Sequence, residues 1–160
     1  GRTGAMAEAV LRGARRAMET ETVMKRAGEA TLEDLLACHG LILGTPENFG
    51  YMSGAVKDLF DRTYYPAEGK MTGRPYAVFI SAGNDGRGAL GQIDRIATGY
   101  GWKKVHDGHI ARGDEWNGAS ASAISGSPYH MRTKSWTLNN VGNQGAHLLD
   151  AVELDEPTTA

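Results

Sequence analysis

The order of apolar and polar positions predicts alternating helices and strands over roughly the first 110 residues. Apolar residues recur every three or four positions in residues 3–17, the spacing of one helix face. The same spacing predicts helices that begin at Thr31 and at Ser53, the second reaching about Arg62, and another around residues 90–97. Thr31 with Asp34 three residues later is typical of a capping box, which supports the start of the second helix.

Between these helices lie short segments that predict strands. Residues 41–43 and 76–80 are apolar without alternation, as in a parallel strand that is covered on both faces. Residues 21–27 form a more polar candidate strand, and residues 102–110 a final one. The alternation predicts an α/β fold with a parallel sheet, in which ligands bind at the carboxyl ends of the strands.

The last third of the chain has a different composition. Residues 111–160 contain Gly- and Ser-rich stretches, which are typical of loops or of loosely packed chain. We therefore expect a domain at residues 1–110 and a divergent tail at residues 111–160. Leu148, Leu149 and Val152 indicate one short helix near residues 145–153.

Charge and cysteine content narrow the classes of function. The chain has 17 Lys and Arg against 19 Asp and Glu, a net charge of −2, which argues against a nucleic-acid partner. The single cysteine excludes an internal disulfide framework and fits a reducing compartment. Apolar runs are too short to span a bilayer, and the opening residues do not start a signal peptide. We expect a cytoplasmic protein without a membrane or nucleic-acid partner.

Three loops carry the candidate chemistry. Residues 45–54 offer aromatic surface and flexible backbone just after a strand, a combination that suits a flat heteroaromatic ring. Residues 81–86 bring backbone N–H groups to the next strand end, and residues 1–4 open a helix whose N-terminus could bind a phosphate. Each loop also has a plain alternative, which is a loop capping the core, a tight turn or an ordinary helix start. Neither a catalytic side-chain set nor a metal site is expected.

The residues of these loops carry a family resemblance. Residues 44–62, GTPENFGYMSGAVKDLFDR, resemble the flavin loop and following helix of the flavodoxin-like proteins. Within them the segment is most similar to the NAD(P)H-dependent FMN reductases and WrbA-like quinone reductases. Residues 1–7 resemble the second half of the FMN phosphate loop, and residues 81–86 resemble the loop at the far edge of the flavin. The resemblance covers about residues 1–105.

The resemblance implies a three-layer sandwich around a parallel sheet of order 2-1-3-4-5, with FMN at its carboxyl edge. The family's first strand and half of its phosphate loop would precede Gly1, so we expect that strand to be absent from a truncated chain. The family's last helix is not recognisable after Ile110. By resemblance, the phosphate contacts are Arg2 and Thr3, the ring borders Pro46, Glu47, Asn48, Phe49, Gly50 and Met52, and its edge meets Gly83, Asn84 and Gly86.

The resemblance also implies a function. It is an FMN-dependent reductase that takes hydride from NAD(P)H through the flavin N5 and reduces a small-molecule acceptor, either a quinone or free flavin. Homo-oligomers are common in the resembled family. Two alternatives stay open, which are a flavodoxin-type electron carrier and a remnant domain that no longer binds FMN. The net charge of −2 gives little of the acidic steering that a carrier uses to dock on its partners.

Overall fold

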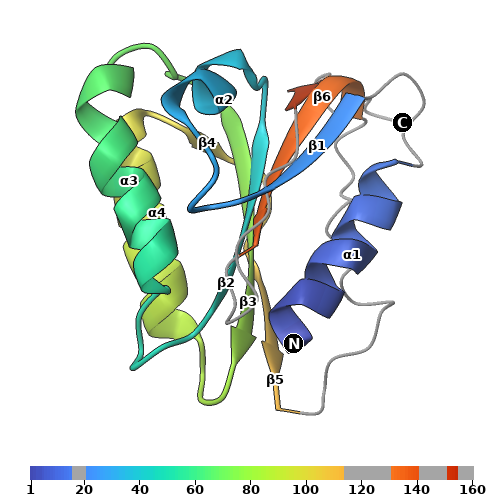
Figure 1. Cartoon of the computed structure of the whole chain (residues 1–160), viewed down its shortest axis with the longest axis vertical. Coiled ribbons are helices and arrows are strands. Elements are labelled where there is room, and N and C mark those ends of the chain that lie inside the picture. The colour runs from blue at the N-terminus through green and yellow to red at the C-terminus, as the bar shows by residue number, and fades with distance from the viewer. Residues whose placement is uncertain (16–20, 114–130, 141–150, 155–160) are drawn as a thin grey trace.

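A single sheet with helices on both faces organises the chain (Figure 1). The structure is a computed structural model, which describes residues 1–15, 21–113, 131–140 and 151–154. The helices are α1 (Arg2–Ala14), α2 (Leu32–Ala37), α3 (Gly54–Ala67) and α4 (Arg87–Tyr100). The strands are β1 (Glu21–Arg26), β2 (Leu41–Pro46), β3 (Pro75–Ala82), β4 (Lys103–Lys104), β5 (His109–Arg112), β6 (Met131–Asn140) and β7 (Ala151–Leu154).

The sheet has the order β1-β6-β2-β3-β4, in which β5 also pairs with β3, and β7 pairs with β6. All pairings are parallel except that of β6 with β7. The α/β class and the parallel sheet expected from the sequence are therefore confirmed. The capping box of α2 is confirmed as well, since Thr31 and Asp34 exchange side-chain-to-backbone hydrogen bonds.

The position of β6 differs from the expectation. In the order 2-1-3-4-5 the place between β1 and β2 belongs to the first strand, which we expected to be absent. Here β6 fills that place. It pairs with the whole of β1, from Glu21 to Arg26, and with β2 from Leu41 to Gly44. An empty place would leave buried backbone groups of β1 and β2 without hydrogen bonds, which is costly. Residues 131–140 thus belong to the sheet rather than to a separate tail.

Four further expectations need correction. Residues 151–154 form β7, antiparallel to β6, rather than part of a helix, and residues 145–150 of that expected helix lie outside the described residues. The single strand expected at residues 102–110 is split into β4 and β5, with Gly108 at φ +96° between them. Helix α1 ends at Ala14 rather than at residue 17, and α3 continues to Ala67 rather than ending at about Arg62.

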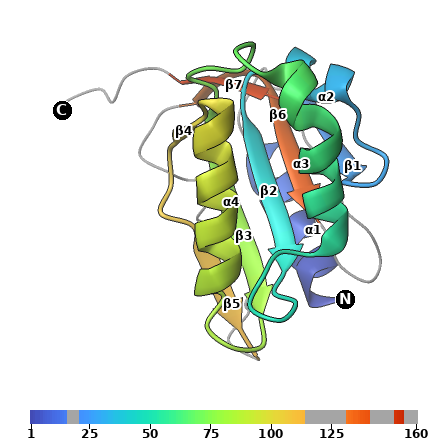
Figure 2. The same cartoon turned by 90° about the vertical axis from the view of Figure 1, so that its left-hand side faces the viewer.

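The helices form two outer layers. Helices α2, α3 and α4 cover one face of the sheet and α1 lies on the other (Figures 1 and 2). Successive β3 side chains alternate between them, as strand geometry requires, since Ala77 and Phe79 pack with the α1 side while Val78 and Ile80 pack with the other. The apolar run of β3 is therefore buried on both sides, as its sequence predicts.

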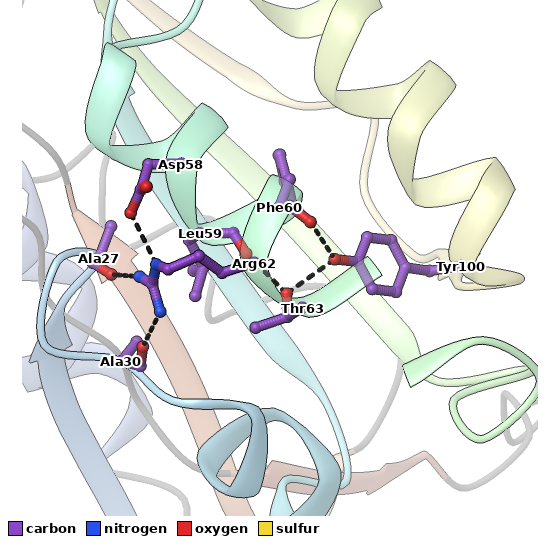
Figure 3. A network of polar contacts seen from close by, with 8 residues as sticks. All are labelled: Ala27, Ala30, Asp58, Leu59, Phe60, Arg62, Thr63 and Tyr100. Carbon is purple, nitrogen blue, oxygen red and sulfur yellow. Dashed lines mark hydrogen bonds and ion pairs between the residues drawn. The ribbon is translucent and has the colours of Figure 1, made fainter. Parts of the chain in front are cut away.

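A polar network fixes α3 against its neighbours (Figure 3). The Arg62 guanidinium donates to the carbonyl oxygens of Ala27 and Ala30, at 3.0 and 3.2 Å, and its Nε lies 2.7 Å from an Asp58 oxygen. On the other side the Tyr100 hydroxyl lies 2.8 Å from Thr63 Oγ1 and donates to the Phe60 carbonyl. These contacts tie α3 to the turn after β1 and to the end of α4.

Among the described residues, every helix is too short or too polar to cross a lipid bilayer.

Candidate functional site

The candidate site lies at the carboxyl edge of the sheet. Strands β2 and β3 end there at Pro46 and Ala82, and helices α3 and α4 begin there after their loops (Figure 2). The N-terminus of α1 lies at the same end of the molecule, on the opposite face of the sheet. The fold thus brings all three loops that the sequence singled out to one edge.

The loop after β2 contains a tight turn. Asn48 and Tyr51 exchange two backbone hydrogen bonds of 2.8 and 2.9 Å, and the residues between them have positive φ values, 52° at Phe49 and 70° at Gly50. Two central residues of positive φ define a type I′ turn, which Asn or Gly adopts more readily than Phe. The Phe49 side chain is fully exposed at the tip. The turn therefore presents a flat aromatic surface at a conformational cost.

Glu47 joins this loop to the loop after β3. Its backbone N–H donates to the Ser81 carbonyl at 2.9 Å. Its carboxylate accepts hydrogen bonds from the backbone N–H groups of Asn84 and Gly86, both at 3.0 Å. The two loops that the resemblance places around a flavin are therefore held together by hydrogen bonds to one side chain.

Two glycines at this edge leave no room for a side chain, and one of them, Gly88, lies against the loop after β2. A Cβ atom at Gly88, in the first turn of α4, would lie 2.1 Å from the Gly50 carbonyl oxygen. Gly86 has φ +69°, and a Cβ atom there would lie 2.6 Å from Ile110. By contrast, a Cβ atom at Gly50 or Gly83 would meet nothing within 4 Å, so the backbone is open at these positions. The loops are packed together on one side and accessible on the other.

The start of α3 is anchored behind the turn. Thr45 Oγ1 accepts a hydrogen bond from the Ser53 N–H at 3.0 Å and donates to the Pro46 carbonyl at 2.9 Å. The Ser53 hydroxyl is buried and has no hydrogen-bond partner among the described residues. Met52 is also buried and packs in the core, so its side chain offers no surface to a ring. The sequence predicts Ser53 as the start of this helix, but it does not indicate the hydrogen bond to Thr45, because the two residues are eight positions apart.

The expected phosphate contacts lie at the start of α1. The helix begins at Arg2 without a side-chain cap, so its first backbone N–H groups lack partners within the helix. The Arg2 guanidinium donates to the Gly113 carbonyl just after β5, and Thr3 is buried. Arg2 is thus engaged with the chain in this structure, and the helix amides are the groups left to receive an anion.

A groove of about 390 Å³ runs beside the site between α3 and α4. Tyr51 of the loop after β2 lines it, and the other lining residues belong to α3 and α4 rather than to the strands. On α3 the 2.5 Å contact between Lys57 Nζ and an Asp61 carboxylate oxygen holds the pKa of Lys57 above its usual value. Its lining residues are Tyr51, Lys57, Phe60, Asp61, Tyr64, Tyr65, Gln92, Arg95, Ile96 and Gly99.

The groups at the carboxyl edge fit a flat heteroaromatic cofactor. The open backbone at Gly50 and Gly83 allows close approach to the edge of a ring, and Phe49 supplies an aromatic face. The side chains of Asn48 and Asn84 are exposed in the same two loops. Of the eleven residues expected at the site, Met52 is turned into the core, while Glu47 and Arg2 are engaged with the protein's own backbone.

Comparisons with known proteins identify the family and the fold of this chain. The family model described as NADPH-dependent FMN reductase matches residues 6–117. A flavodoxin from Aquifex aeolicus is 40% identical over 88 residues, which are 55% of this chain and 48% of the relative, so the match spans about half the relative's length.

Solved structures are similar in fold. A flavodoxin, WrbA-like protein from Agrobacterium tumefaciens has a TM-score of 0.59 at 20% identity, covering 77% of this chain and 84% of that one. A flavodoxin from the domain Archaea has a TM-score of 0.59 at 18% identity, with coverages of 78% and 86%. The fold is therefore flavodoxin-like, and with the family match over most of its length this chain belongs to the NADPH-dependent FMN reductase family of flavoproteins.

Proposed function

We propose that this protein binds FMN at the carboxyl edge and oxidises NAD(P)H to reduce a quinone or free flavin. The observation that supports this most is the pairing of the two loops through Glu47, with open backbone at Gly50 in one loop and at Gly83 in the other. Membership of the family supports FMN as the cofactor. NAD(P)H as the electron donor and a quinone or free flavin as the acceptor are taken from the resemblance of the sequence to the FMN and quinone reductases.

Each part of the chain would have a distinct task. Asn48, Phe49 and Gly50 would border the ring on one side, and Gly83 and Asn84 would border it on the other. The amides at the start of α1 would receive the phosphate, because a helix N-terminus carries partial positive charge. Bound FMN would supply the two-electron chemistry, and the protein supplies position, exclusion of water and electrostatics.

The test is reconstitution followed by turnover. The purified chain is incubated with FMN, freed of excess cofactor by dialysis and assayed for bound flavin. NADPH or NADH oxidation is then followed with a quinone as acceptor and, separately, with free FMN. We expect stoichiometric flavin and acceptor-dependent oxidation of at least one nicotinamide. A protein that stays colourless, and oxidises neither donor, would contradict the proposal.

A second candidate is an electron carrier without a small-molecule substrate. The specific observation in its favour is the 40% identity to a protein named flavodoxin. A carrier would bind FMN equally well but would be reduced only by a protein partner or by a one-electron donor. The donor arm of the same experiment separates the two functions.

A further inference from the structure

We infer that Glu47 is a positioning residue, which holds the loop after β3 in place and sets the charge beside the flavin. This inference rests on the proposed function. The resemblance alone placed Glu47 at the border of the ring. The structure shows its carboxylate directed instead at the chain, where its two oxygens accept from the amides of Asn84 and Gly86 at 3.0 Å each.

The contact crosses a large distance in sequence. Asn84 and Gly86 lie 37 and 39 residues after Glu47. Hydrogen bonds to an ionised acceptor are about twice as strong as neutral ones. The loop after β2 meets the neighbouring chain at two further points, since the Glu47 N–H bonds to the Ser81 carbonyl at the end of β3 and Gly50 packs against Gly88 at the start of α4. Glu47 is the side chain that makes this junction depend on a charged group.

The bonding also divides the loop amides into two sets. Those of Asn84 and Gly86 already donate to the carboxylate, so they are not available to the ring. Those of Phe49 and Gly50 donate no hydrogen bond to the described part of the chain and remain accessible. Glu47 therefore determines which backbone donors are left for the cofactor.

The carboxylate has a second consequence through its charge. A negative group between the two loops that border the ring opposes added negative charge on a reduced flavin. Its removal should move the midpoint potential to a more positive value. A merely structural brace would not have this effect, so the potential separates the two roles.

Two variants divide bonding from charge. Glu47→Gln removes the charge and one of the two acceptor oxygens, whereas Glu47→Asp keeps the charge but is one methylene too short to reach both amides. The matched control is Glu68→Gln at the other end of α3, a helix about 20 Å long, where the side chain is exposed. Thermal unfolding of all four proteins shows whether a variant has lost global stability.

Amide hydrogen exchange of the flavin-free full chain is measured first. We expect faster exchange at Asn84 and Gly86, by roughly tenfold, in both Glu47 variants and unchanged exchange in the control. FMN titration should then show roughly tenfold weaker binding in both variants. The flavin potential should become more positive in Glu47→Gln and stay near the unmodified value in Glu47→Asp.

The outcomes separate this inference from the proposed function. If the unmodified chain binds FMN, and both variants bind it equally tightly with unchanged exchange, the inference is wrong and the proposed function stands. If exchange and affinity change but the potential of Glu47→Gln does not, the charge role is overturned. If the unmodified chain does not bind FMN, the proposed function fails and the role of Glu47 toward flavin fails with it.

Discussion

Gly88 lies where the first turn of α4 meets the loop after β2, and its replacement by alanine tests this junction. The new Cβ atom would lie 2.1 Å from the Gly50 carbonyl oxygen and 3.1 Å from its carbonyl carbon. Both atoms belong to the backbone, so no side-chain rotation relieves the contact. To reach the 3.0 Å below which real Cβ contacts essentially do not occur, the helix and the turn must separate by about 0.9 Å.

The effect on stability is a difference of two terms. Overpacking of this kind costs about 1–3 kcal/mol. Alanine in place of glycine inside a helix returns up to about 1 kcal/mol. The free energy of unfolding of Gly88→Ala should therefore fall by about 0–3 kcal/mol. The fold survives such a loss, and the change is concentrated at the site.

FMN affinity should fall by at least about 1.4 kcal/mol in binding free energy, which is a tenfold rise in Kd. A displacement of this size misplaces the loop groups that would border the ring. In a site that depends on exact positioning, misplacement by about 1 Å can lower the reaction rate by about two orders of magnitude. We expect at least tenfold weaker FMN binding in a titration that follows quenching of flavin fluorescence. The free energy of unfolding is measured separately by urea unfolding.

The matched control is Gly91→Ala, one turn later in the same helix. A Cβ atom there meets nothing within 4 Å, so this variant should gain about 0.5–1 kcal/mol and bind FMN normally. Unchanged FMN affinity in Gly88→Ala, or an equal loss in Gly91→Ala, would refute the reasoning from the junction.

Three further predictions concern separate parts of the molecule. Phe49→Gly should raise the free energy of unfolding by up to about 1 kcal/mol, because glycine adopts the positive φ of this position without strain. The same change should weaken FMN binding, so a loss of stability with unchanged binding would contradict the prediction. Arg62→Gln should cost about 1–3 kcal/mol in urea unfolding, since the Ala27 and Ala30 carbonyls lose a charged donor, whereas exposed Arg12→Gln on α1 should cost little. Burial, together with the nearby charge of His106, lowers the pKa of His109 in the folded chain. Between the folded pKa and the ordinary value of about 6.5, the unfolded chain therefore binds more protons than the folded one. The free energy of unfolding should be highest above about pH 6.5 and should decline as the pH falls toward the folded pKa. His109→Gln should flatten that decline, and an unchanged pH profile would count against the assignment.

Local patterns were sufficient for the elements around the site. The apolar run of β3, the capping box of α2 and the helical spacing of α4 each depend on neighbouring residues, and all three are confirmed. The flavin-loop resemblance also rested on one continuous segment, and the family match confirms it. Where the structural determinant is local, the sequence was informative.

The remaining features depend on contacts between distant segments. Residues 131–140, MRTKSWTLNN, are mostly polar, and their own pattern does not indicate the pairing with β1 and β2. The bond of Glu47 to Gly86 spans 39 residues, and no local spacing indicates it. Nor does the sequence show the positive φ of Phe49, because the preference of Phe opposes it.

The proposed function requires that nicotinamide pass its electrons directly to FMN held at the carboxyl edge. The most direct test is anaerobic mixing of FMN-loaded protein with NADPH or NADH, while the visible absorbance of the flavin is followed. The account predicts rapid and complete bleaching by one of the two donors without any partner protein. Bleaching by dithionite alone, with both nicotinamides inert, would contradict it.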